Sequence, residues 1–194
     1  MTAFFMHYCK SIKQFLLAGF LALVTNLAVA SNGSLNIINA DLEAQDDVYV
    51  LNADIEIKLN EEIEQAILKG FELNFIIEFQ LVAPRKYWFD DEIVTVTRRV
   101  ALNYHALSRQ YLLTRGEQQK TFATLQEAID SLSVISDLKV FQKTEVEKEV
   151  PYKATLLMRL DKTKLPKALQ GDAISLEEWK MTSQRYEWSP NLFK

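Results

Sequence analysis

Residues 71–81 read FELNFIIEFQL, and the alternation within them is the clearest structural signal in the chain. Apolar and polar residues alternate along it, with the apolar set at Phe71, Leu73, Phe75, Ile77, Phe79 and Leu81. A period of two is typical of a long β-strand with one buried face and one solvent-facing face. Pro84 ends the alternation, residues 85–91 read as a turn, and a second long strand returns through residues 94–104. We expect this antiparallel pair to be the centre of a β-rich domain.

The same alternation recurs on both sides of the central pair. A polar turn at residues 45–47 joins the first two of these further strands. The pattern predicts them over residues 35–42, 49–59, 108–114, 138–141 and 152–160, with an edge strand between Trp179 and Trp188. The fold class is therefore mainly β, or α+β: an antiparallel β-sandwich-like domain, or a sheet with helices on one side.

Two short amphipathic helices accompany the strands. Asn60 is suited to N-cap the first, which has three glutamates in its first turn and ends at Lys69 and Gly70. Thr124 and Glu127 match a capping box at the start of the second. The apolar stripe of this second helix is formed by Leu125, Ala128, Ile129 and Leu132.

The first thirty residues have the pattern of a signal peptide. Lysines precede an apolar run at residues 15–24, and Ala-Val-Ala at residues 28–30 provides the small-x-small motif for cleavage between Ala30 and Ser31. The run is shorter than the ~20 residues that a membrane span needs. We therefore expect export to the periplasm. An uncleaved leader that anchors the chain in the inner membrane is the alternative.

Length and composition limit the number of domains and the classes of partner that the rest of the chain can have. It has 194 residues, 48% hydrophobic and 25% charged, so we expect residues 31–194 to form a single domain. Loss of the leader removes Lys10 and Lys13 from 22 basic residues and leaves 20 against 26 acidic ones, a net charge of −6. It also removes Cys9, so the fold must rely on a packed core. An acidic domain without a basic stripe argues against nucleic acid, and against anionic lipid held by charge alone.

A series of landmarks spans most of the mature chain. It includes LNAD at residues 51–54, PRKYWF at 84–89, LNYHALSRQY at 102–111, FATLQEA at 122–128 and the ending at 186–188. In order and spacing these landmarks resemble a bacterial family called domain of unknown function 4390. Members of that family resemble exported proteins of Gram-negative bacteria. Their genes lie beside a membrane histidine kinase of the nitrogen-regulation type, so the resemblance implies a link to envelope signalling. The resemblance brings no catalytic residues.

The candidate binding residues are Arg85, Lys86, Tyr87, Trp88 and Phe89. Three consecutive aromatic residues at a strand connection can form a binding platform, and the neighbouring cations can add cation–π contacts. The alternative is that the rings cap the end of the hydrophobic core. The burial tendency of large aromatic residues favours this core-cap interpretation.

The sequence offers only weak signals for a metal site or for a catalytic site. Asp90, Asp91 and Glu92 lack the spacing of a calcium loop and offer too few oxygens, so we expect no metal. His105 is followed by Ser108, but the sequence has no nucleophile elbow and no identifiable third member of a triad. A hydrogen-bonding role for His105 at a strand end is the better interpretation.

Arg98 falls on the same strand face as Val96 and Val100, because successive side chains alternate. That face is the apolar one, so we expect Arg98 to be buried or half-buried in an ion pair with a carboxylate. The candidate partners on neighbouring strands are Asp54, Glu56 and Glu78.

These observations favour a non-catalytic binding or accessory module without a cofactor. Its expected partner is a protein or another envelope component, such as a membrane signalling protein. A hydrolase that uses His105 with a carboxylate is one alternative, and it predicts a cleft with the two groups within hydrogen-bond reach. A purely structural envelope protein is the other, and it predicts a surface without an exposed apolar patch.

Overall fold

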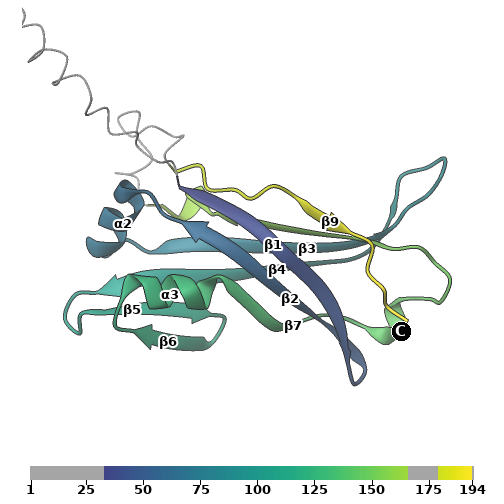
Figure 1. The fold of residues 1–194 in the computed structure, drawn as a ribbon, viewed down its shortest axis with the longest axis horizontal. Helices are drawn as coiled ribbons and strands as arrows, with labels where there is room; N and C mark the ends of the chain where they lie inside the picture. The colour runs from purple at the N-terminus through teal and green to yellow at the C-terminus, as the bar shows by residue number, and fades with distance from the viewer. Residues whose placement is uncertain (1–32, 166–178, 194) are drawn as a thin grey trace, which may run out of the picture. The chain divides into compact units, whose positions relative to one another are not determined.

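The computed structural model describes residues 33–165 and 179–193, which form two antiparallel sheets with two α-helices (Figure 1). The antiparallel, mainly β fold class predicted from the alternation is therefore confirmed. The expected signal peptide, with its cleavage site between Ala30 and Ser31, lies outside the described residues.

The larger sheet has six strands and is centred on β3, the strand that contains most of the FELNFIIEFQL stretch. Both neighbours of β3 run antiparallel to it. Across the sheet the strands are β6 (Gln118–Phe122), β5 (Gln110–Arg115), β4 (Asp91–His105), β3 (Leu73–Ala83), β8 (Lys153–Leu160) and β9 (Tyr186–Trp188).

The smaller sheet has three strands in the order β1-β2-β7. They are β1 (Ser34–Gln45), β2 (Val48–Lys58) and β7 (Val134–Gln142). Asp46 and Asp47 form the tight turn between β1 and β2, where Gln45 pairs with Val48. Asp46 has a φ of +48°, a left-handed conformation that Asp adopts more readily than most residues. The predicted polar turn is confirmed.

Both predicted helices are present with their caps. α2 (Glu61–Leu68) begins where the Asn60 side chain accepts a hydrogen bond from the Ile63 N–H at 2.9 Å, and it ends before Gly70, whose φ is +86°. α3 (Leu125–Leu132) begins with Thr124 Oγ1 accepting from the Glu127 N–H at 3.2 Å. The Glu127 carboxylate accepts from the N–H of Ala123 at 3.1 Å, one residue earlier than in a capping box.

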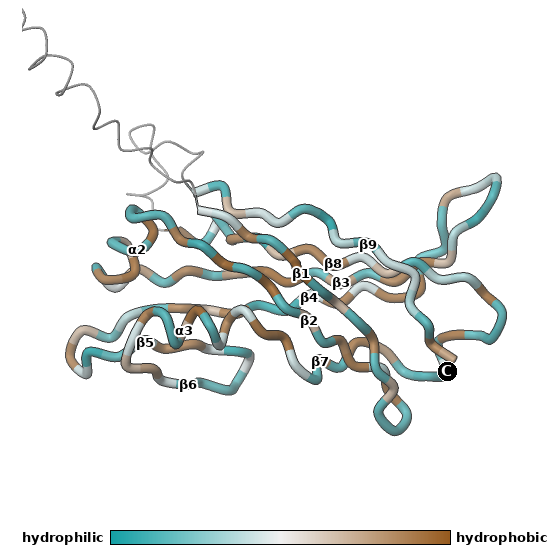
Figure 2. The backbone as a smooth tube through the Cα atoms, viewed as in Figure 1, coloured by the Kyte–Doolittle hydropathy of each residue, from teal (hydrophilic) through white to brown (hydrophobic). Residues whose placement is uncertain are grey.

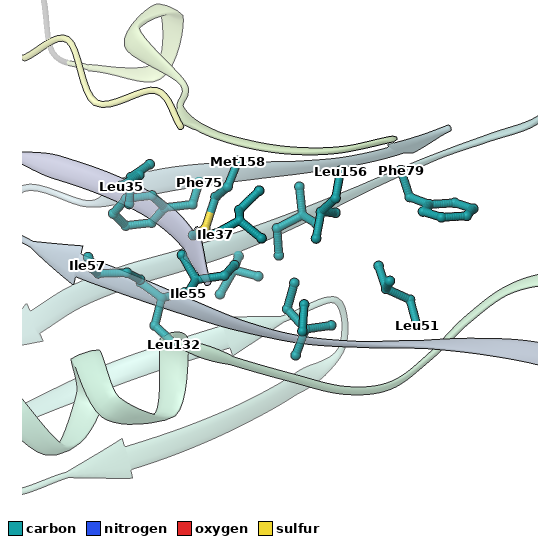
Figure 3. Close-up of a cluster of buried hydrophobic side chains, with 14 of the residues drawn as sticks. Leu35, Ile37, Leu51, Ile55, Ile57, Phe75, Phe79, Leu132, Leu156 and Met158 are labelled. Carbon is teal, nitrogen blue, oxygen red and sulfur yellow. The ribbon is translucent and has the colours of Figure 1, made fainter. Parts of the chain in front are cut away.

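The two sheets enclose a common hydrophobic core (Figure 3). The inner face of β3 contributes Phe75 and Phe79, which are fully buried, and β8 contributes Leu156 and Met158 beside them. The first two strands of the smaller sheet cover this face with Leu35, Ile37, Leu51, Ile55 and Ile57. Figure 2 shows the corresponding alternation of hydrophobic and hydrophilic residues along these strands.

Aromatic rings close one end of this core. Phe79 lies parallel to Phe141 of β7 at 6.2 Å between ring centroids and contacts Trp188 of β9 at the same separation. Tyr49 of β2 stacks on Phe141 at 4.8 Å, and its hydroxyl donates a hydrogen bond to the Leu192 carbonyl. Burial raises the pKa of the Tyr49 hydroxyl. The C-terminal described residues are thus attached to the smaller sheet.

One strand was not predicted, and two strand predictions were wrong in their extent. β6 was not predicted, because residues 118–122 are polar and mostly exposed. β7 begins at Val134, several residues before the predicted start. The final edge strand is confined to β9, whereas residues 179–185 form no strand beyond one bridge between Thr182 and Arg159. None of the helices in the described ranges is long and apolar enough to cross a membrane.

We expect Phe79→Ala to lower the free energy of unfolding by about 3–5 kcal/mol, because it leaves a cavity between the two sheets. Urea denaturation followed by circular dichroism measures this loss. Phe89→Ala is the matched control, since the same atoms are removed from a ring that is 86% exposed. Its effect should stay within about 0.5 kcal/mol. Equal losses from the two variants would contradict this description of the core.

Candidate functional site

The loop between β3 and β4 presents three aromatic side chains to solvent at the tip of the hairpin. Tyr87, Trp88 and Phe89 are 87%, 76% and 86% exposed. Together with Lys86 they border an open hollow of about 350 Å³. We call residues 85–89 the aromatic loop.

The core-cap interpretation of these rings is wrong. Leu81 is the last fully buried residue of β3, and the hairpin runs on beyond it through half-buried Val82 and Ala83. The loop that carries the rings therefore extends past the region that the smaller sheet covers (Figure 1). Without an opposing layer, large aromatic side chains remain in water despite their usual tendency to be buried.

The base of the aromatic loop is held by polar contacts within the hairpin. The Arg85 guanidinium forms an ion pair with the Asp91 carboxylate, and the Arg85 N–H donates to Asp90 Oδ1 at 3.3 Å. Lys86 Nζ lies 5.5 Å from the centre of the Tyr87 ring, within the range of a cation–π contact. Arg85 therefore stabilises the conformation of the loop, whereas Lys86 lies beside the Tyr87 ring.

Asp90 and Asp91 are thus engaged with Arg85, and Glu92 accepts hydrogen bonds from Gln80 at 3.0 Å and from Thr95 at 2.9 Å. These carboxylates take part in the hairpin's own contacts. Across residues 33–165 and 179–193, no three His, Cys, Asp or Glu side chains come together in a way that could hold a metal ion.

His105 lies exposed at the end of β4, in the turn that leads to β5. Its Nδ1 lies 3.0 Å from Ser108 Oγ and accepts a hydrogen bond from the Ser108 N–H at 3.3 Å. Among the described residues, no carboxylate forms a hydrogen bond or an ion pair with the ring. The contacts are local to the turn, and they lack the third group that orients a catalytic histidine.

Arg98 lies on the predicted face of β4, but the expected burial and ion pair were wrong. It pairs in register with Ile77 of β3, whose side chain faces the core, yet Arg98 is exposed. The reason is that the smaller sheet ends at β7, so this part of the inner face of β4 borders an open cleft.

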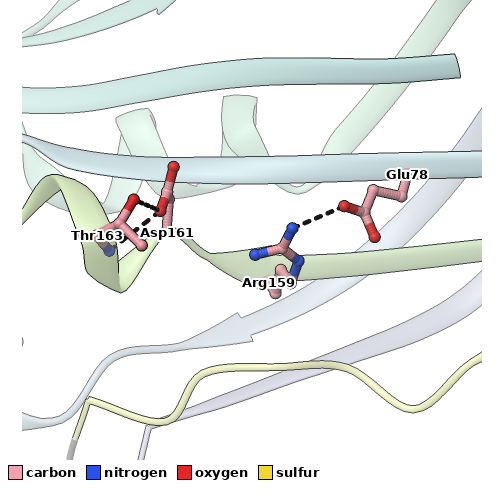
Figure 4. A network of polar contacts seen from close by, with 4 residues as sticks. All are labelled: Glu78, Arg159, Asp161 and Thr163. Carbon is pink, nitrogen blue, oxygen red and sulfur yellow. Dashed lines mark hydrogen bonds and ion pairs between the residues drawn. The ribbon is translucent and has the colours of Figure 1, made fainter.

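None of the three carboxylates predicted to pair with Arg98 forms an ion pair with it. Glu78 pairs with Arg159 of β8, with Arg159 Nη2 2.7 Å from Glu78 Oε1 (Figure 4). Glu56 pairs with Lys58 at 2.7 Å, and Asp54 is exposed. The alternation of residues 153–160 places Arg159 on the outer face with Glu78, so the sequence contained a signal for this pair. Both side chains are about one third exposed, and such a pair contributes little to stability.

Asp161 is a buried carboxylate that follows β8 directly (Figure 4). Its Oδ1 accepts hydrogen bonds from Thr163 Oγ1 at 2.6 Å and from the Thr163 N–H at 3.1 Å, which caps the short 3-10 helix η2 (Lys162–Lys164). The hydroxyl bond is the largest cause that lowers the pKa of Asp161. Burial opposes it, and the charges of Arg159 and Arg99 assist it. This cluster stabilises the chain at the end of β8.

Fold and surface define the class as a two-sheet antiparallel β domain with an exposed aromatic hairpin tip. A family model described as "Domain of unknown function (DUF4390)" matches residues 32–189. The chain therefore belongs to this family, as the sequence landmarks predicted. No curated protein and no solved structure matches the chain.

We expect Asp161→Ala to lower the free energy of unfolding by about 1 kcal/mol at neutral pH, the usual effect of losing a capping side chain. Because the folded-state pKa is lowered, the carboxylate stabilises the fold above its unfolded pKa of about 3.9. That part is lost as the pH falls through the folded value.

Urea denaturation across the acid range measures this effect. The difference between Asp161→Ala and the parent should shrink below about pH 4. Asp161→Asn keeps a capping oxygen without the charge, and should therefore be less destabilised than the alanine variant at neutral pH. A deficit for Asp161→Ala that is the same at every pH would contradict the role of the ionised carboxylate.

Proposed function

We propose that this protein is an exported, non-catalytic binding module that holds a protein or another envelope component through the aromatic loop. The observation that carries the proposal is the exposure of three consecutive aromatic side chains, each at least 76% accessible, at the tip of a hairpin. Contiguous exposed apolar surface on a folded domain is typical of an interaction site.

The chemistry of the aromatic loop suits recognition of a protein. Tyr and Trp are enriched among the residues that contribute most to protein–protein binding, because each buries a large, rigid surface and also has a polar group. The contacts of Arg85 with Asp90 and Asp91 restrain the loop before binding, which reduces the conformational entropy lost on association. Lys86 adds a positive charge at the edge of the rings.

The alternatives receive less support. His105 and Ser108 lie in an exposed turn without an orienting carboxylate among the described residues, so no observation favours a hydrolase. A purely structural role would need no exposed apolar patch, whereas the aromatic loop is one.

Export is supported by the leader pattern of residues 1–30. A membrane signalling protein, which the family resemblance implies, is the partner class that we propose to test first.

We expect the protein expressed from the full sequence in a Gram-negative host to be recovered from the periplasm, with Ser31 as its first residue. Fractionation with intact-mass measurement and N-terminal sequencing checks this. Ala30→Arg should leave the precursor uncleaved, because signal peptidase needs a small residue there. Intact precursor in the membrane fraction would support the anchored alternative, and intact precursor in the cytosol would contradict export.

We expect Tyr87→Ala/Trp88→Ala to reduce partner capture about ten-fold or more, as for residues that dominate an interface. Periplasmic proximity labelling with the parent as bait identifies the partner, and quantitative pull-down compares the variants. The melting temperature should change by no more than about 2 °C, because both rings are exposed.

Leu107→Ala is the control for this experiment, since Leu107 is 94% exposed in the turn at the other end of β4. It should capture the partner as the parent does. Undiminished capture by the double variant, or equal loss with Leu107→Ala, would show that the aromatic loop is not the binding surface.

A further inference from the structure

A cleft of about 610 Å³ lies away from the aromatic loop, between the inner face of β4–β6 on one side and the end of α3 with β7 on the other. Its inner lining is apolar, with Ile77 and Val100 from the larger sheet opposite Leu132 and Ile135. Each of these four side chains is buried. Both the volume and the apolar lining are typical of sites that hold a small molecule.

Three cations follow one another across the sheet on the same side as this lining. Arg115 of β5 pairs in register with Val100, and Lys120 of β6 pairs with Leu113, so both share the inner face with Arg98. Arg115 is a diagonal neighbour of Arg98 and also of Lys120, and diagonal neighbours lie about 7–8 Å apart. Like charges at this spacing repel one another, which is a cost to the fold.

Arg115 has a structural partner. Its guanidinium donates hydrogen bonds to the Ser131 carbonyl and, at 3.3 Å, to the Val134 carbonyl. These carbonyls lie where α3 ends, the negative pole of the helix dipole. Burial lowers the pKa of Arg115, but an arginine stays charged at neutral pH. We therefore infer that Arg115 has a structural role: it holds the junction between α3 and β7 in place.

Arg98 and Lys120 form no hydrogen bond or ion pair with a carboxylate in the described parts of the chain. Asp130, the acidic residue on the cleft wall, accepts a hydrogen bond from Gln126 on its own helix at 2.7 Å. Two exposed cations thus stand at the mouth of an apolar cleft, in a domain whose expected net charge is negative.

Arg99 also borders the cleft, but its charge acts on the other side of the sheet. It alternates with Arg98 along β4, and its charge helps to lower the pKa of Asp161 next to Arg159. Its guanidinium therefore lies outside the cleft, and Arg99 offers a matched control for Arg98.

We propose that this cleft binds a small anionic amphiphile. A carboxylate or phosphate head accepts charge-assisted hydrogen bonds from Arg98 and Lys120, and an apolar chain lies against Ile77, Leu132 and Ile135. The net charge of the domain does not attract anions, so affinity depends on this local pair of cations together with the apolar lining. The site is separate from the aromatic loop, and the inference does not depend on the function proposed for that loop.

The test titrates dodecyl phosphate, below its critical micelle concentration, into protein that is expressed from the full sequence. The protein is purified with or without residues 1–30, depending on whether the cell cleaves them. ¹H–¹⁵N NMR shifts should cluster at Leu132, Ile135 and the facing residues of β4. Arg98→Gln/Lys120→Gln should weaken binding about ten-fold or more, because charge-assisted hydrogen bonds are lost. Arg99→Gln should stay within about two-fold of the parent, since only the opposite face changes.

Two other probes separate the contributions of the head and the chain. Inorganic phosphate and the uncharged dodecyl maltoside should each bind about ten-fold more weakly than dodecyl phosphate, since each lacks one of the two contacts. Equal binding of the maltoside would overturn the role of the cations. Equal binding of inorganic phosphate would overturn the role of the apolar lining.

Stability distinguishes a binding role from a structural one. The double variant should melt no lower than the parent, and about 1–3 °C higher if removal of like-charge repulsion dominates. Gln118 of β6 pairs in register with Arg115 and so shares the inner face of the sheet. Gln118→Trp, which fills the cleft from β6 and leaves both cations in place, should also abolish binding. A lower melting temperature of the double variant together with unchanged binding by Gln118→Trp would overturn the proposal, as would parent-like binding by the double variant.

Discussion

The burial of β3 determines how the other strands of this domain are arranged. Its inner face, from Phe75 to Leu81, is removed from water, and even Ile76 on the outer face is only 3% exposed. Such a strand needs a neighbour on each edge and a layer over its inner face. β4 and β8 are the neighbours, and they place Arg99 and Arg159 beside Ile76, where their aliphatic stems can shield it. β1, β2 and β7 are the layer.

The two layers differ in size, and both proposed sites follow from that difference. Three strands cannot cover six, so the inner face of β4–β6 extends past β7 and is covered there by α3. The remaining space is the cleft beside Arg98. The β3–β4 hairpin likewise continues past the last buried side chain, and the aromatic loop lies on that extension. In the described part of the chain, the fold thus leaves apolar surface accessible at both the cleft and the aromatic loop.

Sequence reasoning succeeded where the signal was local. Alternation identified β2, β3 and β8, and the capping residues Asn60 and Thr124 located both helices. It failed where burial depends on the opposite layer. The face of Arg98 could be predicted from alternation, but its exposure depends on where β7 ends, and the exposure of Trp88 depends on how far the smaller sheet reaches. β6 has a polar sequence with no periodicity to detect, since its pairing with β5 is what makes it a strand.

The attachment of Leu192 to Tyr49 has a consequence for the order of events during synthesis. The Tyr49 hydroxyl donates a hydrogen bond to the carbonyl of Leu192, a residue 143 positions further along the chain. Trp188 can contact the Phe79 ring only after β9 has been synthesised. A nascent chain that contains the early hairpins alone therefore leaves one end of its interior open to water. Apolar surface exposed in this way favours aggregation until the closing segment has been made, which is the hazard that chaperones counter in incomplete chains.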